Sequence, residues 1–336
     1  KELCKTAGIQ VIDTFIQRRP HPDPKYVVGK GKIEEIALKA LDNNIDLLIF
    51  NNNLTPNQMR SIAKETDLRI IDRTMLILDI FAKHAKSSEG KLQVELAQMR
   101  YTLPRLVEKD TAMSRLSGGI GLRGPGETKL EMNRRRARER IQSLEQQIEK
   151  LANQRSLKRK KRDDSFIPVI SLIGYTNAGK STLLNALTQS NVETANKLFS
   201  TLDTTIRRIR FPQEREVIIA DTVGFIRDLP SDLIAAFRAT LEELAHSNLL
   251  IHLVDVSDEN YDDKIQSVLN ILEQLDLMEI ASILVFNKND LVNYAVLQTR
   301  IQKFQAISIS AVNKNGLDNL LDHIERRLWH NATLSQ

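Results

Sequence analysis

Three patterns in this 336-residue chain predict an α/β protein: a small N-terminal α/β domain with a long antiparallel helical hairpin, followed by a doubly wound α/β domain. Strand-like and helix-like segments alternate in the first part of the chain and again in the last part, which is typical of sheets covered by helices. Between these parts, apolar residues recur at spacings of four and three along two helix-like segments. We expect domains at residues 1–88, 89–163 and 164–336.

The N-terminal part is expected to form a small, mostly parallel sheet. Its strand-like segments are separated by helix-like ones, and this alternation favours parallel pairing over hairpins. Thr55 is suited to cap a helix that begins at Pro56, because proline is tolerated at the first helical position. The expected strands are residues 9–16, 45–50 and 68–72, and the expected helices are residues 31–41, 56–64 and 74–86.

The middle part is expected to be a hairpin of two amphipathic helices. Neither helix can bury its apolar seam alone, so antiparallel packing of the two seams is the simplest arrangement. Pro104 is expected to kink or interrupt the first arm. The seam residues are Leu92, Leu96, Met99, Leu103 and Leu106 in the first arm, and Ala137, Ile141, Leu144, Ile148 and Leu151 in the second.

A glycine-rich segment, residues 117–127, lies between the two arms. It contains five glycines and one proline in eleven residues, which excludes a regular helix or strand. A simple turn needs far fewer residues, so we interpret the segment as a loop that fits a crowded surface. A flexible linker is the alternative interpretation.

Positive charge is concentrated in one short stretch. Residues 129–162 carry a net charge of +9, whereas residues 163–336 carry −8. A polyanion such as nucleic acid is the natural partner of this stretch, and a solvated helix surface is the plainer alternative. The candidate RNA-contacting residues are Arg115, Arg123, Lys129, Arg134, Arg135 and Arg136.

Composition narrows the class of protein. Cys4 is the single cysteine, so an internal disulfide is impossible, and this suits a reducing compartment. No apolar run approaches the roughly 20 residues of a membrane span, and the first residues lack a signal-peptide pattern. We expect a soluble, cytoplasmic monomer.

Residues 164–336 are predicted to form a doubly wound α/β domain. The segments around residues 205–211 and 215–221 are joined by a short polar turn and should pair antiparallel. The remaining strands need helical crossovers and should be parallel. The other expected strands are residues 167–173, 249–255, 282–287 and 304–309, and the expected helices are residues 180–188, 232–246, 262–275, 294–303 and 316–329.

A glycine-framed loop follows the first strand of this domain. Residues 174–181 read Gly-Tyr-Thr-Asn-Ala-Gly-Lys-Ser, the phosphate-binding P-loop pattern between a strand and a helix. The N–H groups of residues 176–182 are expected to surround phosphates, with Lys180 reaching the β- and γ-phosphates and Ser181 binding Mg²⁺. The expected nucleotide-binding residues are Gly174, Tyr175, Thr176, Asn177, Ala178, Gly179, Lys180, Ser181 and Thr182.

Two further segments are expected to sense the γ-phosphate. Asp221 ends a strand and is expected to contact Mg²⁺ through water, while the Gly224 N–H senses the phosphate. Thr201 is our candidate for the Mg²⁺-binding threonine of the first switch loop, with Thr204 and Thr205 as close alternatives. The catalytic candidates are therefore Lys180, Thr201 and Gly224.

A fourth segment selects the base. Residues 287–290 read Asn-Lys-Asn-Asp after an apolar strand. An aspartate there accepts hydrogen bonds from N1–H and the 2-amino group of guanine, which adenine cannot provide. The residues expected at the base are Asn287, Lys288, Asp290, Ser310 and Ala311. Four motifs in this order predict a P-loop (Ras-like) GTPase domain that binds GTP and GDP.

One position departs from the Ras-like pattern. Phe225 stands where Ras-like enzymes place a glutamine that orients the attacking water. We therefore expect slow intrinsic hydrolysis and a partner that supplies the missing function. Asn177 resembles the asparagine that helps certain GTPases to bind K⁺, so K⁺ is a candidate second cofactor beside Mg²⁺.

The chain as a whole resembles the HflX family of ribosome-associated GTPases. The resemblance is carried by residues 91–98, 118–128, 174–181 and 221–227, and the glycine-rich segment is specific to this family. Residues 71–74 (Ile-Asp-Arg-Thr) and 78–81 (Leu-Asp-Ile-Phe) also match. Thr204 departs from the proline that many members have there, and the terminal extensions of some members are missing from these residues.

The resemblance implies a factor that binds the large ribosomal subunit (50S) and its rRNA and splits stalled or stressed 70S ribosomes. It implies that the hairpin reaches toward the peptidyl-transferase region and that the ribosome stimulates hydrolysis. It also implies ATP as a further nucleotide of the N-terminal region, where residues 29–32 open a helix without a specific motif. The alternatives are a large-subunit assembly factor, an ATP-dependent rRNA remodeller and a nonenzymatic RNA-binding scaffold.

Overall fold

The computed structural model describes residues 1–105, 129–163, 167–188, 199, 205–211, 215–221, 224–226 and 244–330. They fall into two compact units, which are residues 1–83 with 92–149, and residues 84–91 with 150–336. Thr201, the glycine-rich segment, Leu106 and most of the helix expected at 232–246 lie outside the described residues. Of the described helices, none has both the length and the apolar character that a bilayer span requires.

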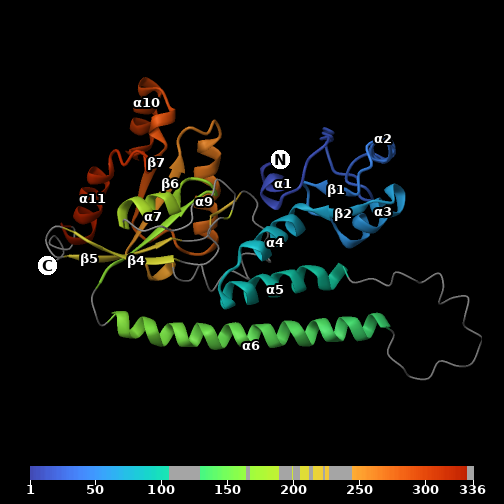
Figure 1. The fold of residues 1–336 in the computed structure, drawn as a ribbon, viewed down its shortest axis with the longest axis horizontal. Coiled ribbons are helices and arrows are strands. Elements are labelled where there is room, and N and C mark those ends of the chain that lie inside the picture. Colours follow the sequence, from blue (N-terminus) through green and yellow to red (C-terminus); the bar gives the residue numbers. More distant parts are fainter. Residues whose placement is uncertain are drawn as a thin grey trace, which may run out of the picture. The chain divides into compact units, whose positions relative to one another are not determined.

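The sheet of the first unit has two parallel strands, β1 (Leu47–Phe50) and β2 (Arg69–Asp72). Two helices, α2 (Lys30–Asp42) and α3 (Pro56–Thr66), belong to the same part of the chain (Figure 1). A capping box begins α3, since the Thr55 hydroxyl accepts from the Gln58 N–H at 3.2 Å and the Gln58 side chain accepts from the Thr55 N–H at 2.9 Å. This arrangement confirms the predicted cap and the parallel pairing.

The strand expected at residues 9–16 is wrong. These residues form no strand ladder, and Ile12 and Ile16 are exposed. Alternating apolar residues favour a strand only where a neighbouring strand offers its edge. Within the described part of the chain, β1 and β2 pair only with each other. The short helix α1 (Glu2–Ala7) precedes this extended segment.

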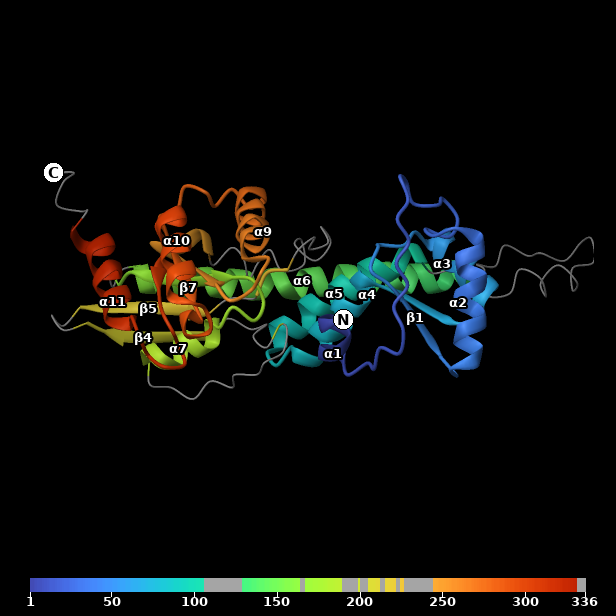
Figure 2. The same cartoon turned by 90° about the horizontal axis from the view of Figure 1, so that it is seen from above.

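The first unit also contains most of the predicted hairpin. Helix α4 (Arg73–His84) leads to α5 (Ser88–Thr102), and the long α6 (Lys129–Asp163) returns beside α5 in the opposite direction (Figures 1 and 2). Leu96 on α5 and both Ala137 and Leu144 on α6 are buried, as the seams predicted. As expected at Pro104, α5 ends at Thr102 and the chain continues as a 3₁₀ turn over Leu103–Arg105.

The second unit is built on a six-stranded sheet with the order β4-β5-β3-β6-β7-β8. As predicted, β4 and β5 are antiparallel and every other pair is parallel. The strands are β3 (Val169–Gly174), β4 (Thr205–Arg210), β5 (Glu216–Asp221), β6 (Leu249–Asp255), β7 (Ser282–Asn287) and β8 (Ile307–Ser308). The helices are α7 (Lys180–Thr188), α9 (Tyr261–Gln274), α10 (Tyr294–Phe304) and α11 (Leu317–Glu325).

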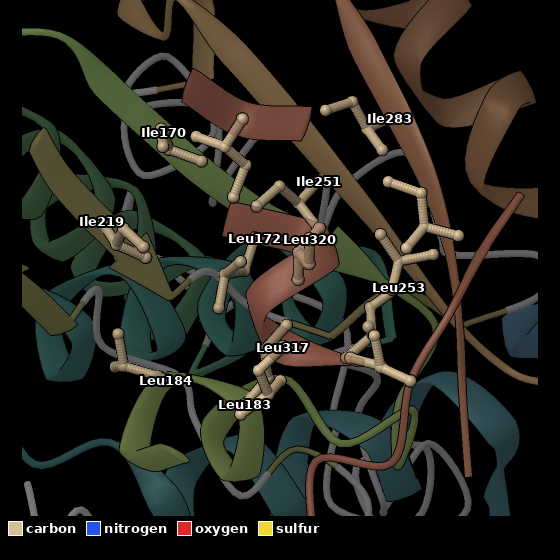
Figure 3. Close-up of a cluster of buried hydrophobic side chains, with 14 of the residues drawn as sticks. Ile170, Leu172, Leu183, Leu184, Ile219, Ile251, Leu253, Ile283, Leu317 and Leu320 are labelled. Atoms are coloured by element: carbon tan, nitrogen blue, oxygen red, sulfur yellow. The ribbon is translucent and has the colours of Figure 1, made fainter. Parts of the chain in front are cut away.

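One face of this sheet forms the main apolar core. Figure 3 shows Leu172 and Ile251 from neighbouring strands close to Leu320 from α11, with Leu183 and Leu184 from α7 below. All of these side chains are fully buried. Burial at about 25 cal/mol per Å² of apolar surface makes such a cluster the main stabilising term of the unit. The core holds the carboxyl ends of β3, β5, β6 and β7 in fixed register, and the candidate site is built there.

Candidate functional site

The loop between β3 and α7 depends on its glycines. Gly174 has a φ of +151° and Gly179 a φ of +94°, where L side chains are rarely found. A Cβ on Gly174 would collide with the Leu253 carbonyl, and a Cβ on Gly179 would collide with the Asn287 side chain. The loop is therefore packed directly onto β6 and β7, which fixes its backbone.

Lys180 begins α7 and folds back over this loop. Its Nζ donates to the carbonyl oxygens of Gly174 at 3.2 Å and Tyr175 at 3.3 Å. Burial lowers the pKa of Lys180, and the nearby Asp221 carboxylate partly opposes this effect. A buried ammonium group at a helix N-terminus is well placed to receive an anion, because both the charge and the helix dipole attract it.

The next residue, Ser181, meets Asp221. The Ser181 hydroxyl donates to Asp221 Oδ2 at 2.7 Å, and both residues are buried. A hydroxyl and a carboxylate are hard oxygen donors of the kind that Mg²⁺ accepts together with waters and phosphates. These two residues fit a Mg²⁺ ion.

The chain beyond β5 is joined to the same loop. Phe225 donates its N–H to the Gly174 carbonyl at 3.1 Å, and its own carbonyl accepts the Thr176 N–H at 2.8 Å. A Cβ on Gly224 would lie 2.9 Å from Thr176 Cγ2 and 3.1 Å from Lys180 Nζ. Gly224 is thus placed beside the Lys180 ammonium group. The Thr176 N–H is engaged with Phe225, whereas we expected the whole run of N–H groups over 176–182 to face phosphates.

The Phe225 side chain is only 2% exposed. It lies in the protein interior and has no hydrogen-bonding group, so it cannot orient a water molecule. The backbone pairing of Phe225 with the loop was not predicted, because the sequence gives no signal for a bridge between residues so far apart.

Asn287 at the end of β7 connects two loops. Its Nδ2 donates to the Ala178 carbonyl at 2.8 Å, and its Oδ1 accepts the Ala311 N–H at 3.0 Å. Asn287 and Ala311 are buried. The asparagine therefore holds the loop at 174–181 and the loop at 310–311 at a fixed separation.

Lys288 and Asp290 complete this end of the sheet. The Lys288 Nζ forms an ion pair with Asp255 Oδ2 at 2.6 Å, and Asp255 Oδ1 accepts the Ser257 N–H at 3.0 Å. Asp290 follows in a short 3₁₀ turn (Asn289–Leu291) with its side chain exposed. Asp255 was missed by sequence reasoning, although a lone acid at the end of the apolar strand β6 is a usable signal.

His252 was also missed. It lies on β6 beside Ile173 of β3, is buried, and has a pKa lowered to about 4 by burial and then by the Lys180 charge. It is therefore neutral at physiological pH. A single histidine in an apolar strand carries no sequence signal for a functional role.

The structure thus brings together most of the predicted nucleotide residues. The candidate RNA-contacting residues belong to other parts of the chain. The residues that meet at the carboxyl edge of the sheet are Lys180, Ser181, Asp221, Gly224, Asn287 and Ala311. Lys129 begins α6, where Arg134 is half-buried and Arg135 and Arg136 are exposed. Thr201, Arg115 and Arg123 lie outside the described residues.

Comparisons with known proteins identify the family of this chain. Three family descriptions match in succession: "GTP-binding GTPase N-terminal" over residues 1–82, "GTP-binding GTPase Middle Region" over residues 84–162, and "50S ribosome-binding GTPase" over residues 169–288.

Individual relatives cover nearly the whole chain. The GTPase HflX of Caldanaerobacter subterraneus subsp. tengcongensis is 49% identical over 329 residues, which is 98% of this chain and 76% of the relative. The GTPase HflX of Escherichia coli strain K12 is 43% identical over 333 residues, covering 98% of this chain and 78% of the relative. A crystal structure of SsGBP in complex with GDP is similar with a TM-score of 0.51 and 27% identity, covering 99% of this chain and 94% of that one.

These relatives share the P-loop domain and the regions before it, so the similarity is not confined to the nucleotide site. The chain is a GTPase that hydrolyses GTP, and it belongs to the HflX family of ribosome-associated GTPases.

Proposed function

We propose that this GTPase binds the large ribosomal subunit and splits stalled or stressed 70S ribosomes, with GTP hydrolysis stimulated by the ribosome. The buried position of Phe225 carries the second part of this proposal. The site contains groups suited to phosphate and Mg²⁺, but the buried Phe225 side chain has no group that could orient the attacking water. The family description "50S ribosome-binding GTPase" over residues 169–288 supports the ribosome as the partner that supplies the water-orienting group.

In the proposed cycle, each side chain of the site has a role. Lys180 neutralises the β- and γ-phosphates, and the loop N–H groups orient them. GTPases of this fold generally use Mg²⁺, which would be held by Ser181, by Asp221 through water, and by Thr201. The ion would neutralise charge that develops on the phosphates. Gly224 lies beside Lys180, and its N–H would report the γ-phosphate to the segment that follows it.

The guanine base is proposed to bind at the loops that follow β7 and β8. Asp290 would accept from guanine N1–H and the 2-amino group. The Ala311 N–H, which donates to Asn287 Oδ1 at 3.0 Å, would be shared with guanine O6. Asn287 holds these loops in register through its hydrogen bonds at 2.8 and 3.0 Å. The Lys288 side chain, fixed by its 2.6 Å ion pair with Asp255, would cover one face of the base.

We also propose a K⁺ ion beside the phosphates, held in part by Asn177. Asn177 has a φ of +65°, an uncommon conformation for a side-chain-bearing residue. Equal hydrolysis rates in K⁺ and Na⁺ buffers would exclude this role.

The hairpin is the proposed RNA-contacting module. Arg135 and Arg136 are exposed on α6, in the stretch of residues 129–162 that carries a net charge of +9. Arginine binds phosphate oxygens through two parallel hydrogen bonds, so an exposed row of arginines suits an rRNA surface. Deletion of residues 117–126 should leave intrinsic hydrolysis unchanged and remove the ribosome-dependent function.

The proposal is tested by measuring GTP hydrolysis alone, with 50S subunits and with 70S ribosomes, while light scattering follows subunit separation. Stimulated hydrolysis together with GTP-dependent loss of 70S particles supports splitting. Stimulation without separation favours an assembly factor, and unchanged hydrolysis rejects the ribosome as the stimulating partner. Lys180→Ala serves as the nucleotide-site control, because it removes the charge that faces the phosphates.

A further inference from the structure

A buried carboxylate lies at the carboxyl end of β2, far from the nucleotide residues in the sequence. Asp72 is completely buried. Its Oδ1 accepts the Met75 N–H at 2.9 Å, and its Oδ2 accepts both the Leu54 N–H at 3.1 Å and the Tyr101 hydroxyl. Burial of a carboxylate is unfavourable unless hydrogen-bond donors satisfy it, and these three donors offset that cost for Asp72.

Arg105 closes the cluster from the other side. Its Nη1 donates to the Tyr101 carbonyl at 2.7 Å, and its Nη2 donates to the Leu54 carbonyl at 2.8 Å and lies 3.9 Å from Asp72 Oδ2. Its guanidinium group stacks 3.4 Å from the centre of the Tyr101 ring. Arginine is suited to this position because one planar group can donate in several directions and stack at the same time. The 3₁₀ turn after α5 is thereby tied to the loop after β1.

The tyrosine keeps its proton in this environment. Burial raises the pKa of Tyr101, and its hydrogen bond to Asp72 raises it further. Tyr101 therefore remains a neutral donor to the carboxylate at any physiological pH. This cluster joins β2, the loop after β1 and the end of α5 within the first unit.

The contacts between α5 and α6 are of a different kind. Arg100 pairs with Glu145 and Arg140 pairs with Glu95, both at 2.7 Å, but all four side chains are exposed by about a third or more. Exposed pairs contribute about 0–1 kcal/mol each. The buried Asp72 cluster is screened less by water than these ion pairs, and it links β2 directly to the end of α5.

We propose that Asp72, Tyr101 and Arg105 are positioning residues that hold the basic hairpin in one orientation against the N-terminal sheet. The consequence for RNA binding rests on the proposed function, since it assumes that α6 meets the large subunit. A hairpin that is already fixed presents its arginines in one geometry. Binding to RNA then costs less conformational entropy, because the hairpin is ordered beforehand. This role accounts for Asp72 in the Ile-Asp-Arg-Thr segment at residues 71–74, to which the nucleotide site assigns nothing.

Spin labels can test the orientation directly in the full chain. Leu38 on α2 is 64% exposed and Gln146 on α6 is exposed, so cysteines at these two positions can carry labels in a Cys4→Ala background. We expect a narrow distance distribution in the parent and a broader or shifted one in Asp72→Asn, Tyr101→Phe and Arg105→Gln. Asp79→Asn is the matched control, because it converts an exposed carboxylate of α4 into an amide. A narrow, unshifted distribution in all three variants would overturn the inference.

A second measurement separates this inference from the proposed function. Binding of 50S subunits should weaken by about tenfold in the three variants, while GDP affinity and intrinsic hydrolysis stay at the parent values. If the parent itself does not bind 50S subunits, the proposed partner is wrong, and the label distances still decide the positioning role. If broadened variants bind 50S subunits as tightly as the parent, the orientation has no part in RNA binding. Tyr101→Phe removes one hydroxyl only, so it carries the test if Asp72→Asn does not fold.

Discussion

The hydroxyl of Ser181 donates a 2.7 Å hydrogen bond to Oδ2 of Asp221, and this contact joins the first turn of α7 to the end of β5. The two residues are 40 positions apart in the chain, and both are buried. Their oxygens form the part of the site that is chemically suited to Mg²⁺.

Ser181→Ala should weaken Mg²⁺-dependent nucleotide binding. Loss of the hydroxyl removes one metal ligand and leaves the buried Asp221 carboxylate with one donor fewer, which costs about 1–3 kcal/mol. Titration of Mg²⁺ at fixed GTP concentration should show roughly a 10- to 100-fold weaker response. Ser282→Ala, at an exposed position on β7, is the control and should behave as the parent. An unchanged Mg²⁺ dependence in Ser181→Ala would argue against this metal site.

Asp290→Asn should change the preferred base. The amide has one uncharged acceptor oxygen in place of two charged ones, and its NH₂ group faces a guanine donor. Each lost charge-assisted bond costs about 1.5–3 kcal/mol. Affinity for GDP should fall by at least a hundredfold, while affinity for xanthosine diphosphate rises. Calorimetry with both nucleotides measures the switch, and Asp322→Asn on the exposed side of α11 is the matched control. Equal GDP binding by Asp290→Asn and the parent would reject the assignment.

Phe225→Gln should not restore a water-orienting side chain. Phe225 is 2% exposed, so the new amide would be buried rather than directed at a nucleotide. Loss of the ring from the interior should lower the free energy of unfolding by about 3–5 kcal/mol. Denaturant unfolding and single-turnover hydrolysis measure the two effects. Faster intrinsic hydrolysis in this variant would contradict the buried placement of the side chain.

Gly179→Ala should damage the nucleotide site, whereas Gly31→Ala should not. Gly179 has a φ of +94°, and a Cβ there would collide with the Asn287 side chain. A Cβ at Gly31 would meet nothing within 4 Å. We expect GDP affinity to fall by more than about tenfold in Gly179→Ala, because the loop must move away from β7. Gly31→Ala should raise the free energy of unfolding by up to about 1 kcal/mol, since alanine favours the helix. Fluorescent GDP binding and thermal unfolding distinguish the two variants.

Stability should fall in mild acid because of His252. Burial and the Lys180 charge lower its pKa to about 4 in the folded protein, compared with 6.5 in a model peptide. Its contribution is therefore complete above about pH 6.5 and is lost as the pH falls toward about 4, because the unfolded chain binds the proton first. As the pH falls over this range, the parent should lose a few kcal/mol of unfolding free energy relative to His252→Phe, which has no imidazole to protonate. His323→Gln, at an exposed position, is the control, and a pH-independent difference would rule out this role.

Local patterns in the sequence were sufficient for much of this molecule. The strands of the P-loop domain, the antiparallel pairing of β4 with β5, and the cap formed by Thr55 depend on residues close together in the chain. The same holds for the P-loop itself, where glycine spacing, the preceding strand and the following helix are adjacent. The hairpin seams were predicted because a heptad spacing needs a partner helix, and the next amphipathic segment supplied one.

Contacts between distant residues needed the tertiary structure. The strand expected at residues 9–16 is wrong, because alternating apolar residues do not reveal whether a neighbouring strand is available to pair. The link from Asp255 to Lys288 and the burial of His252 beside Lys180 depend on which strands are neighbours in the sheet. The cluster of Asp72, Tyr101 and Arg105 depends on where α5 ends against β2.

The sequence by itself therefore determined the order of strands in the P-loop domain, the GTPase chemistry and the family of this protein, because each is encoded by short segments with regular spacing. Only the tertiary structure decided that Phe225 is buried and that Asp72, at the end of β2, contacts Tyr101 at the end of α5. Burial and the satisfaction of a buried charge depend on side chains from several elements at once, and no single segment of the chain contains that information.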